Sequence, residues 1–299
     1  MPETKRKRLR VAKAYKMYVG GAFVRSESGR CFQVEGRGAD TAHPPKVNVP
    51  LGSRKDVRDA VVAAKNAQPG WAARTAYNRG QILYRFAEVL EARRTELALS
   101  LVRGGTAEAV AAREVDCAID RVVFYAGFTD KYPSLVATSN PVSGPYFVLS
   151  VPEAMGVVGI VAPDEPALLG LISTVLPVIL SGNTSVVLAS EADPCTPLVL
   201  CELLATSDLP GGVVNVLSGR VAELAPHIAK HREVDALDVW STHADLSVTL
   251  EKGGSGNVKR MKMRSRLAPA AWLDDRAGQG LGWIESFLET KTLWHPVGV

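Results

Sequence analysis

GVVGIVA, at residues 156–162, is an unbroken apolar run followed by Pro163. Its length and β-branched content are typical of a buried strand. Three more short, mainly apolar segments that read as buried strands follow, at residues 184–190, 213–219 and 235–241, and segments with helical spacing of their apolar residues separate them. Buried strands that alternate with amphipathic helices predict βαβ units. We therefore expect an α/β fold in which a parallel sheet carries helices on both faces.

The part of the chain before these strands is predicted to be helical after an opening hairpin. Residues 15–34 predict two short strands around the turn Gly20-Gly21, and residues 39–50 are a Pro-rich connection. Helical spacing of apolar residues predicts helices over about 56–68, 77–94 and 107–131. A β-rich segment at 142–153 then leads into the first buried strand.

The composition is that of an ordinary globular protein. The chain has 299 residues, of which 46% are hydrophobic and 22% charged. No apolar run approaches the roughly 18 residues that a membrane helix needs. The basic N-terminus is not followed by the apolar segment of a secretory signal. We therefore expect a cytoplasmic protein without a membrane partner, whose four cysteines are reduced thiols.

Basic residues are concentrated in two stretches of the chain. Residues 1–16 hold seven Lys and Arg, residues 252–266 hold six, and Glu3 is the only acid in either stretch. Neither stretch is interleaved with aromatic residues, and no nucleic-acid-binding motif accompanies them. Solvated ends of structural elements are the preferred interpretation, and a nucleic-acid partner is not expected.

The common catalytic and metal-binding signatures are absent from the sequence. No Gly-x-Gly-x-x-Gly follows a strand, and there is no phosphate loop, Gly-x-Ser-x-Gly elbow or His-Glu-x-x-His. His227 and His231 are four residues apart and could share a metal, but the sequence suggests no third ligand. We expect exposed helical histidines there and predict no metal site.

Several short motifs, in order along the chain, resemble the N-terminal, dinucleotide-binding half of the aldehyde dehydrogenase superfamily. The motifs are Tyr18-Val19-Gly20-Gly21-Ala22-Phe23, Pro69-Gly70-Trp71, Phe124-Tyr125-Ala126-Gly127, Gly156-Val157-Val158-Gly159, Ser181-Gly182-Asn183-Thr184 and Leu209-Pro210-Gly211-Gly212-Val213-Val214-Asn215-Val216. This resemblance implies a Rossmann-like sheet, a small protruding β hairpin for oligomerisation, and NAD or NADP as the cofactor.

The family's functional residues are changed at the matching positions. Its Pro-Trp-Asn signature, whose Asn helps to hold the oxyanion, falls on Pro163-Asp164-Glu165, so a carboxylate replaces an amide donor. Its Lys-Pro-Ser-Glu motif, which holds the adenosine ribose, falls on residues 188–191 and keeps only Glu191. Its Gly-Ser-Thr turn at the cofactor phosphates falls on Ser241-Thr242-His243, preceded by Trp240. The resemblance thus assigns Glu191, Ser241 and Thr242 to cofactor binding and no residue to catalysis.

The catalytic nucleophile and base of the family have no clear counterparts. The family's nucleophilic cysteine lies in a second domain, and nothing here resembles the Gly-Gln-x-Cys segment around it. VTLEKGG, at residues 248–254, resembles the family's Thr-Leu-Glu-Leu-Gly-Gly and would make Glu251 the general base. NVKRM, at residues 257–261, instead resembles the Asn-Leu-Lys-Arg-Val that ends the preceding helix, and its spacing from Ser241 needs no gap. This second alignment is preferred, and it leaves Glu251 off the base-bearing strand.

After Met261 the sequence resumes near the family's C-terminal end. FLETKTLW, at residues 287–294, resembles the C-terminal Glu-Val-Lys-Thr-Val strand, which in the family joins the hairpin in a small sheet that docks on a neighbouring subunit. We expect a basic arm at 1–16, a dinucleotide-binding domain at 17–262 that includes an oligomerisation hairpin at 141–153, a linker at 263–282 and an oligomerisation strand at 283–299.

Three functions are compatible with these residues. The preferred hypothesis is a non-catalytic subunit that assembles with a full-length NAD(P)-dependent aldehyde dehydrogenase, or with itself. An active NAD(P)-dependent oxidoreductase acting on aldehydes is an alternative, and it requires an activated thiol beside an oxyanion donor. A dinucleotide-binding module that senses without reacting is the third.

Overall fold

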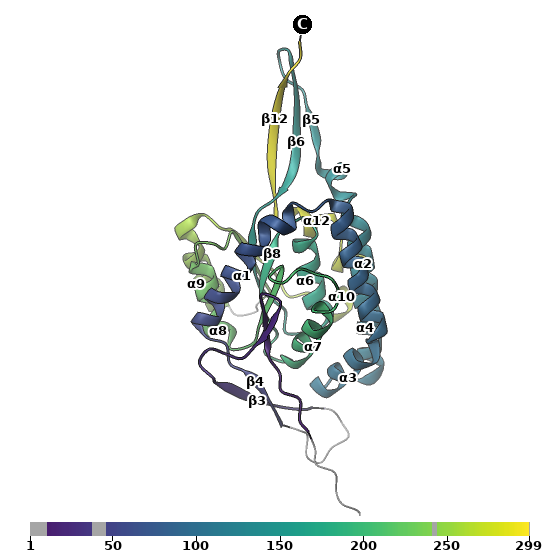
Figure 1. Cartoon of the computed structure of the whole chain (residues 1–299), viewed down its shortest axis with the longest axis vertical. Coiled ribbons are helices and arrows are strands. Elements are labelled where there is room, and N and C mark those ends of the chain that lie inside the picture. Colours follow the sequence, from purple (N-terminus) through teal and green to yellow (C-terminus); the bar gives the residue numbers. More distant parts are fainter. Residues whose placement is uncertain (1–10, 38–45, 241–243, 299) are drawn as a thin grey trace, which may run out of the picture.

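The molecule is a seven-stranded sheet between two layers of helices, with a narrow three-stranded arm projecting from one end (Figure 1). A computed structural model describes residues 11–37, 46–240 and 244–298. It confirms the predicted α/β class, with its Rossmann-like parallel sheet, flanking helices and protruding hairpin.

Five parallel strands form most of the large sheet, and an antiparallel hairpin completes one edge. The strand order is β11-β10-β7-β8-β9-β1-β2. The parallel strands are β7 (Val157–Val161), β8 (Thr184–Leu188), β9 (Val214–Leu217), β10 (Ala236–Val239) and β11 (Arg260–Met263). The hairpin consists of β1 (Met17–Val19) and β2 (Ala22–Val24). Every residue of β7, β8, β9 and β10 is buried, as a parallel sheet covered on both faces requires.

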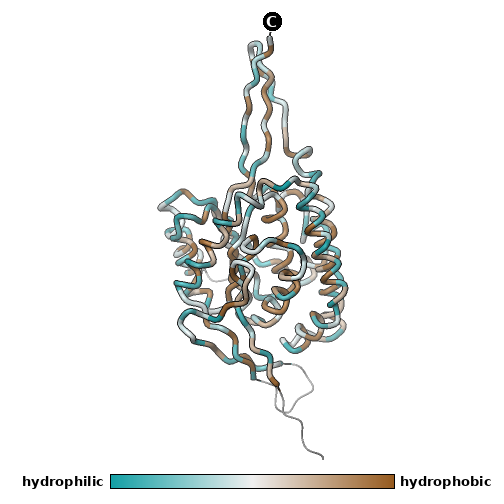
Figure 2. The backbone as a smooth tube through the Cα atoms, in the orientation of Figure 1, coloured by the Kyte–Doolittle hydropathy of each residue, from teal (hydrophilic) through white to brown (hydrophobic). Residues whose placement is uncertain are grey.

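Helices cover both faces of this sheet and form two apolar clusters with it. One face carries α1 (Arg54–Ala72), α8 (Val221–Lys230) and α9 (Ala244–Gly254). The other carries α2 (Ala76–Ala92), α3 (Arg94–Gly104), α4 (Glu108–Phe128), α6 (Leu169–Ile179) and α7 (Cys195–Leu204). Figure 2 shows brown, hydrophobic segments gathered in the middle of the molecule, where α6 packs on the sheet, and more teal on the outer helices.

The ends of two helices differ from those predicted from spacing alone. The first helix begins at Arg54, because Ser53 and Asp56 form a capping box, and it continues past Pro69 to Ala72. The helix predicted to reach residue 131 ends at Phe128, and a separate short helix, α5 (Tyr132–Val136), follows with Pro133 in its first turn.

The projecting arm is a three-stranded antiparallel sheet. Its strands are β5 (Thr138–Asn140), β6 (Tyr146–Ala154) and β12 (Leu288–Pro296), in the order β12-β6-β5. β12 lies within the expected C-terminal strand segment and pairs with β6 over its whole length, from Leu288 opposite Ala154 to Pro296 opposite Tyr146. Segments more than 130 residues apart in sequence therefore form one element.

A small sheet lies where only a Pro-rich connection was predicted. β4 (Lys46–Pro50) pairs with β3 (Cys31–Glu35), and Val47 and Val49 stand opposite Val34 and Phe32. The alternation of Val47 and Val49 is the strand signal that the nearby prolines obscured. Residues 39–45 of the predicted connection lie outside the described residues.

The segment expected to be a linker is packed against the helical layer. It contains α10 (Pro269–Trp272), α11 (Asp275–Gly278) and the start of α12 (Leu281–Glu285), and η1 (Ser255–Asn257) precedes β11. Trp272 is 1% exposed, and Arg121 of α4 donates to the backbone carbonyls of Trp272 and Gly278. A buried Trp and a buried Arg thus hold this segment on the domain. In the described part of the chain, no helix has the length and apolar character needed to cross a membrane.

Candidate functional site

The strand order creates a crevice at one end of the sheet, between β7 and β10. The chain passes from β7 through α6 to β8 on one side, whereas β10 pairs with β7 on the other side. Loops that leave the carboxyl ends of such neighbouring strands diverge, and ligands of open α/β sheets bind there. A pocket of about 270 Å³ occupies this place and is lined by Pro163, Asp164, Glu165, Ala192, Trp240, Arg266, Leu267 and Trp272.

The acidic pair after β7 supports the crevice without offering a hydrogen-bond donor. Asp164 Oδ1 accepts a hydrogen bond from the backbone N–H of Glu191 at 2.9 Å, and the Asp164 carbonyl accepts one from Ser190 Oγ at 2.9 Å. Asp164 thereby joins the loop after β7 to the loop after β8. Glu165 is exposed and lies 4.0 Å from Arg266. An ionised carboxylate only accepts hydrogen bonds, so neither side chain can serve as an oxyanion donor.

Trp240 and Trp272 line one side of the crevice, and Trp283 and Arg264 contact the Trp240 ring. The rings of Trp240 and Trp283 are stacked, with centroids 5.2 Å apart, and Trp272 lies 4.9 Å from Trp240. The guanidinium of Arg264 lies over Trp240 and over Trp283, and its Nε donates to Asp238. This aromatic cluster was not predicted. Two tryptophans in a short segment otherwise rich in Gly and Ala were the available signal.

Asp238 is a buried acid beneath this cluster. Its carboxylate also accepts a hydrogen bond from Trp240 Nε1 at 3.0 Å. Burial raises the pKa of Asp238, whereas the Arg264 guanidinium and these hydrogen bonds oppose the shift. The pair therefore anchors Trp240 and β11 on the sheet.

Of the three predicted cofactor residues, Glu191 lies among the described residues. Glu191 Oε1 accepts a hydrogen bond from the Val221 N–H at 2.5 Å, at the start of α8, and Oε2 accepts one from Arg220 at 3.1 Å. Its side chain remains 29% exposed. The position of the family's lysine is Leu188, a buried residue of β8. Ser241, Thr242 and His243 lie outside the described residues.

No acid stands on the strand next to β10. β11 reads RMKM and is followed by Arg264, while Glu251 is exposed in α9. The segment after the helix therefore carries cations where the resemblance would place a base-bearing strand.

The cysteines are not arranged as an activated nucleophile. None of the four lines the crevice. Burial, reinforced by Asp193, raises the pKa of Cys195 to about 12, and burial raises the pKa of Cys201 and of Cys117. Cys31 is exposed on β3. Catalytic thiols need a depressed pKa, which these environments do not provide to the buried ones. Among the described residues, no three His, Cys, Asp or Glu side chains are grouped as a metal site.

Comparison with known proteins identifies the fold. The model of the aldehyde dehydrogenase family matches residues 37–262. The chain belongs to the aldehyde dehydrogenase family. This match includes β7, β8, β9 and β10, but it ends before Arg266, Leu267 and Trp272 of the crevice and before β12.

Several solved structures superpose on the chain over most of its length. An aldehyde dehydrogenase from Bacillus cereus, solved as its NAD+ complex, has a TM-score of 0.78 and 24% identity, covering 85% of this chain and 51% of that one. HpcC from Thermus thermophilus has a TM-score of 0.77 and 26% identity, over 86% and 48%. An NADP-dependent enzyme from E. coli has a TM-score of 0.77 and 20% identity, over 84% and 51%. The chain thus spans about half the length of these structures.

Proposed function

We propose that this chain is a non-catalytic member of the aldehyde dehydrogenase family, which assembles through its β5-β6-β12 arm with a full-length NAD(P)-dependent aldehyde dehydrogenase. The observation that carries the proposal is the arm itself. A nine-residue strand from the end of the chain is paired along β6, outside the globular body (Figure 1).

The arm exposes apolar side chains on both faces. Successive residues of a strand point to opposite faces, so Leu293 and Trp294 lie on different sides of this thin sheet. Leu293 stands opposite Leu149 on one face, while Trp294 packs edge-on against Tyr146 on the other. Trp294 is 61% exposed. Exposed apolar residues on both faces of one thin sheet favour burial against another subunit.

The outer edge of the arm also favours assembly. Within the described residues β12 pairs with β6 only, so beyond Leu288, whose carbonyl accepts a hydrogen bond from Arg260, its other edge presents backbone N–H and C=O groups without a strand partner. Edge strands of this length are templates for pairing with a strand of another chain. Lys291 and Glu153 form an ion pair across β12 and β6. The part of the arm beyond this pair carries mainly apolar side chains.

The crevice gives little support to independent catalysis. Asp164 and Glu165 offer hydrogen-bond acceptors where an oxyanion needs a donor. β11 carries no acid that could act as a general base, and no cysteine lies in the pocket. The arm continues directly into the amino end of β7, so the crevice at the carboxyl ends lies at the opposite end of the sheet. Docking through the arm would leave the crevice uncovered.

Affinity purification from the protein's own cells tests this proposal. The tagged chain is isolated, its partners are identified by mass spectrometry, and the native mass of the complex is measured. We expect a full-length aldehyde dehydrogenase in fixed ratio. Trp294→Asp should abolish recovery, because it places a charge in the apolar contact. Tyr84→Asp introduces the same charge at a 54% exposed aromatic of α2 and should leave recovery unchanged.

Two results would contradict the proposed role. One is a discrete homo-oligomer with no partner. The other is aldehyde-dependent NADH formation by the pure chain that thiol alkylation abolishes, because this result requires an activated cysteine.

A dinucleotide-binding role is a second candidate, favoured by Glu191 and Arg220. Both lie between the end of β8 and the start of α8, and Arg220 also stacks on Phe32. A carboxylate at this place of a Rossmann-like fold suits ribose hydroxyls, and a neighbouring Arg suits the 2′-phosphate of NADP. The residues at the ribose end therefore fit a dinucleotide, which would supply hydride chemistry if it bound.

Calorimetric titration separates this second candidate from the first. We expect NADP to bind more tightly than NAD, and Arg220→Ala to remove the difference. Arg232→Ala removes an exposed arginine beyond the end of α8 and serves as the control. Absence of heat with either dinucleotide at millimolar concentration would exclude a cofactor role.

A further inference from the structure

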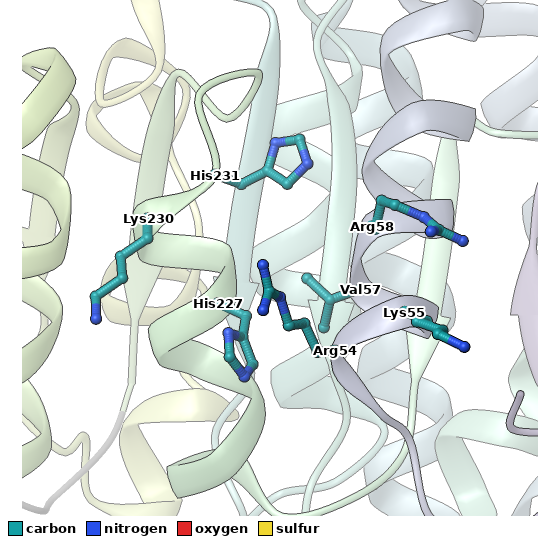
Figure 3. Close-up of a pocket in the computed structure, with 7 residues that line it drawn as sticks. All are labelled: Arg54, Lys55, Val57, Arg58, His227, Lys230 and His231. Atoms are coloured by element: carbon teal, nitrogen blue, oxygen red, sulfur yellow. The ribbon is translucent and has the colours of Figure 1, made fainter. Parts of the chain in front are cut away.

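A groove between α1 and α8 gathers basic side chains on the face of the sheet opposite α6. Its volume is about 660 Å³, and it is lined by Arg54, Lys55, Val57, Arg58, His227, Lys230 and His231. Figure 3 shows the Arg54 side chain in the gap between the helices, with the His227 and His231 rings to either side of its guanidinium. Lys55, Arg58 and Lys230 extend outward from the gap in that view.

The central cation of this groove has no acidic partner within the described residues. Lys55 pairs with Glu27 at 2.5 Å and Arg58 pairs with Asp59 at 2.7 Å. No such ion pair forms at Arg54 or at Lys230 in the described chain, and no acid lines the groove. Positive charge gathered without compensation attracts anions.

The position of Arg54 is unfavourable for the helix that carries it. Arg54 and Lys55 are the first two residues of α1, where the helix dipole favours acids. The nearby Asp56 is committed to the capping box with Ser53 and does not line the groove. His227 and Lys230 lie in the last turn of α8, where cations are favourable. The basic residues of α8 therefore have a structural explanation, and Arg54 does not. Local rules are most often broken at functional sites.

The two histidines respond to the surrounding charge. Burial, followed by Arg54 and Lys230, lowers the pKa of His227. Burial and Lys259 lower the pKa of His231, while Glu233 opposes the shift. A bound anion would reverse this repulsion and favour the charged imidazoles.

We propose that the groove binds a small phosphate-bearing molecule, whose phosphate contacts Arg54 between His227 and His231. The planar guanidinium matches phosphate oxygens with two hydrogen bonds. The groove has the size of small-molecule sites, about 300–1,000 Å³, so it can hold more than a single phosphate. Val57 supplies an apolar wall for the remainder of the ligand. None of these residues lines the crevice beside β10 or belongs to the arm, so this site is independent of the function proposed above.

Calorimetric titration of the full chain with inorganic pyrophosphate tests the site. Two variants remove one arginine each from α1. Arg54→Gln removes the cation in the gap, and Arg58→Gln removes the one that points outward and pairs with Asp59. We expect Arg54→Gln to weaken binding by at least about tenfold, the value of one charge-assisted hydrogen bond. Arg58→Gln should weaken it by less than about threefold, through screened long-range charge alone.

The melting temperature of the ligand-free chain is a second readout, and Arg54→Gln should change it in the opposite direction to the affinity. Because Arg54 opposes the helix dipole, Arg54→Gln should raise the melting temperature slightly while it lowers affinity. The proposal is overturned if the wild-type chain shows no pyrophosphate binding at millimolar concentration. Equal weakening by the two variants would also overturn it, because that result indicates nonspecific attraction.

Discussion

Arg264 Nε donates a hydrogen bond to Asp238 Oδ1 across 2.8 Å, and this carboxylate is 1% exposed. The pair joins the residue after β11 to the middle of β10. It also holds Arg264 over the stacked rings of Trp240 and Trp283, so one ion pair organises the aromatic side of the crevice.

Removing the arginine should be strongly destabilising. Arg264→Met leaves Asp238 buried without its cation, which costs about 3–5 kcal/mol for pairs of this kind. Urea unfolding measures the loss. Arg266→Met is the matched control, since Arg266 is exposed and lies 4.0 Å from the exposed Glu165, and its effect should stay within about 0.5 kcal/mol. If Arg264→Met loses no more unfolding free energy than Arg266→Met, Asp238 has found another partner.

Asp56 should contribute more to stability than an ordinary helix cap. Its carboxylate accepts hydrogen bonds from Ser26 Oγ at 2.9 Å, the Glu27 N–H at 3.0 Å and the Ser53 N–H at 2.7 Å. Asp56→Ala removes one half of the capping box and takes the acceptor from one buried and two part-buried donors, so we expect a loss of about 2–4 kcal/mol in urea unfolding. Asp59→Ala, an exposed acid one turn further along α1, should cost less than about 1 kcal/mol. A loss below that of Asp59→Ala would contradict this role.

The four buried strands and the helices between them were predictable, because the apolar runs are short and regularly interrupted. GVVGIVA at 156–162 became β7, the middle one of the five parallel strands, and the three later runs became β8, β9 and β10. The spacing of apolar residues was less informative about where helices begin and end. The capping box of Asp56 sets the start of α1, and Pro133 lies in the first turn of α5, which follows the end of α4. β4 was missed since its two valines stand among prolines.

The candidate site was predictable only in part, because its geometry depends on contacts distant in sequence. Pro163, Asp164 and Glu165 were identified because the family's Pro-Trp-Asn signature falls on them, and they do line the crevice. Trp272 reaches it from a segment that showed no regular periodicity, and Trp283 of the same segment stacks on Trp240. Arg121, which is buried and holds Trp272 through its carbonyl at 3.0 Å, gave no signal within α4.

Thiol labelling should follow burial and reveal no activated cysteine. Cys31 is exposed and should react first with a disulfide reagent at neutral pH, whereas Cys201 is fully buried and should react only when the chain unfolds. Cys195, whose pKa burial raises to about 12, should also be slow. Mass spectrometry after timed quenching assigns the order, with Cys31→Ser as the control that removes the fast phase. Rapid labelling of Cys195 in slightly acidic buffer would instead identify a reactive thiolate.

Glu114 offers a pH-dependent test of the helical layer. Its Oε1 accepts hydrogen bonds from the backbone N–H groups of Leu168 and Leu169, where α6 begins. Burial raises the pKa of Glu114, and these two hydrogen bonds only partly oppose the shift. A carboxyl group whose pKa is raised on folding stabilises the protein most below its unfolded pKa, about 4.3. That contribution is lost as the pH rises through the higher pKa of the folded state.

Glu114→Gln should therefore change stability in a pH-dependent way. The variant keeps a neutral oxygen acceptor and cannot ionise, so its stability lacks the decline that Glu114 gives the wild-type chain. We expect the wild-type stability minus that of Glu114→Gln, measured by urea unfolding from about pH 4 to 7, to fall as the pH rises. Glu108→Gln changes an exposed acid in the first turn of the same helix and should show a smaller pH dependence. A difference that grows with pH would mean that the hydrogen bonds from Leu168 and Leu169 outweigh the burial of the charge.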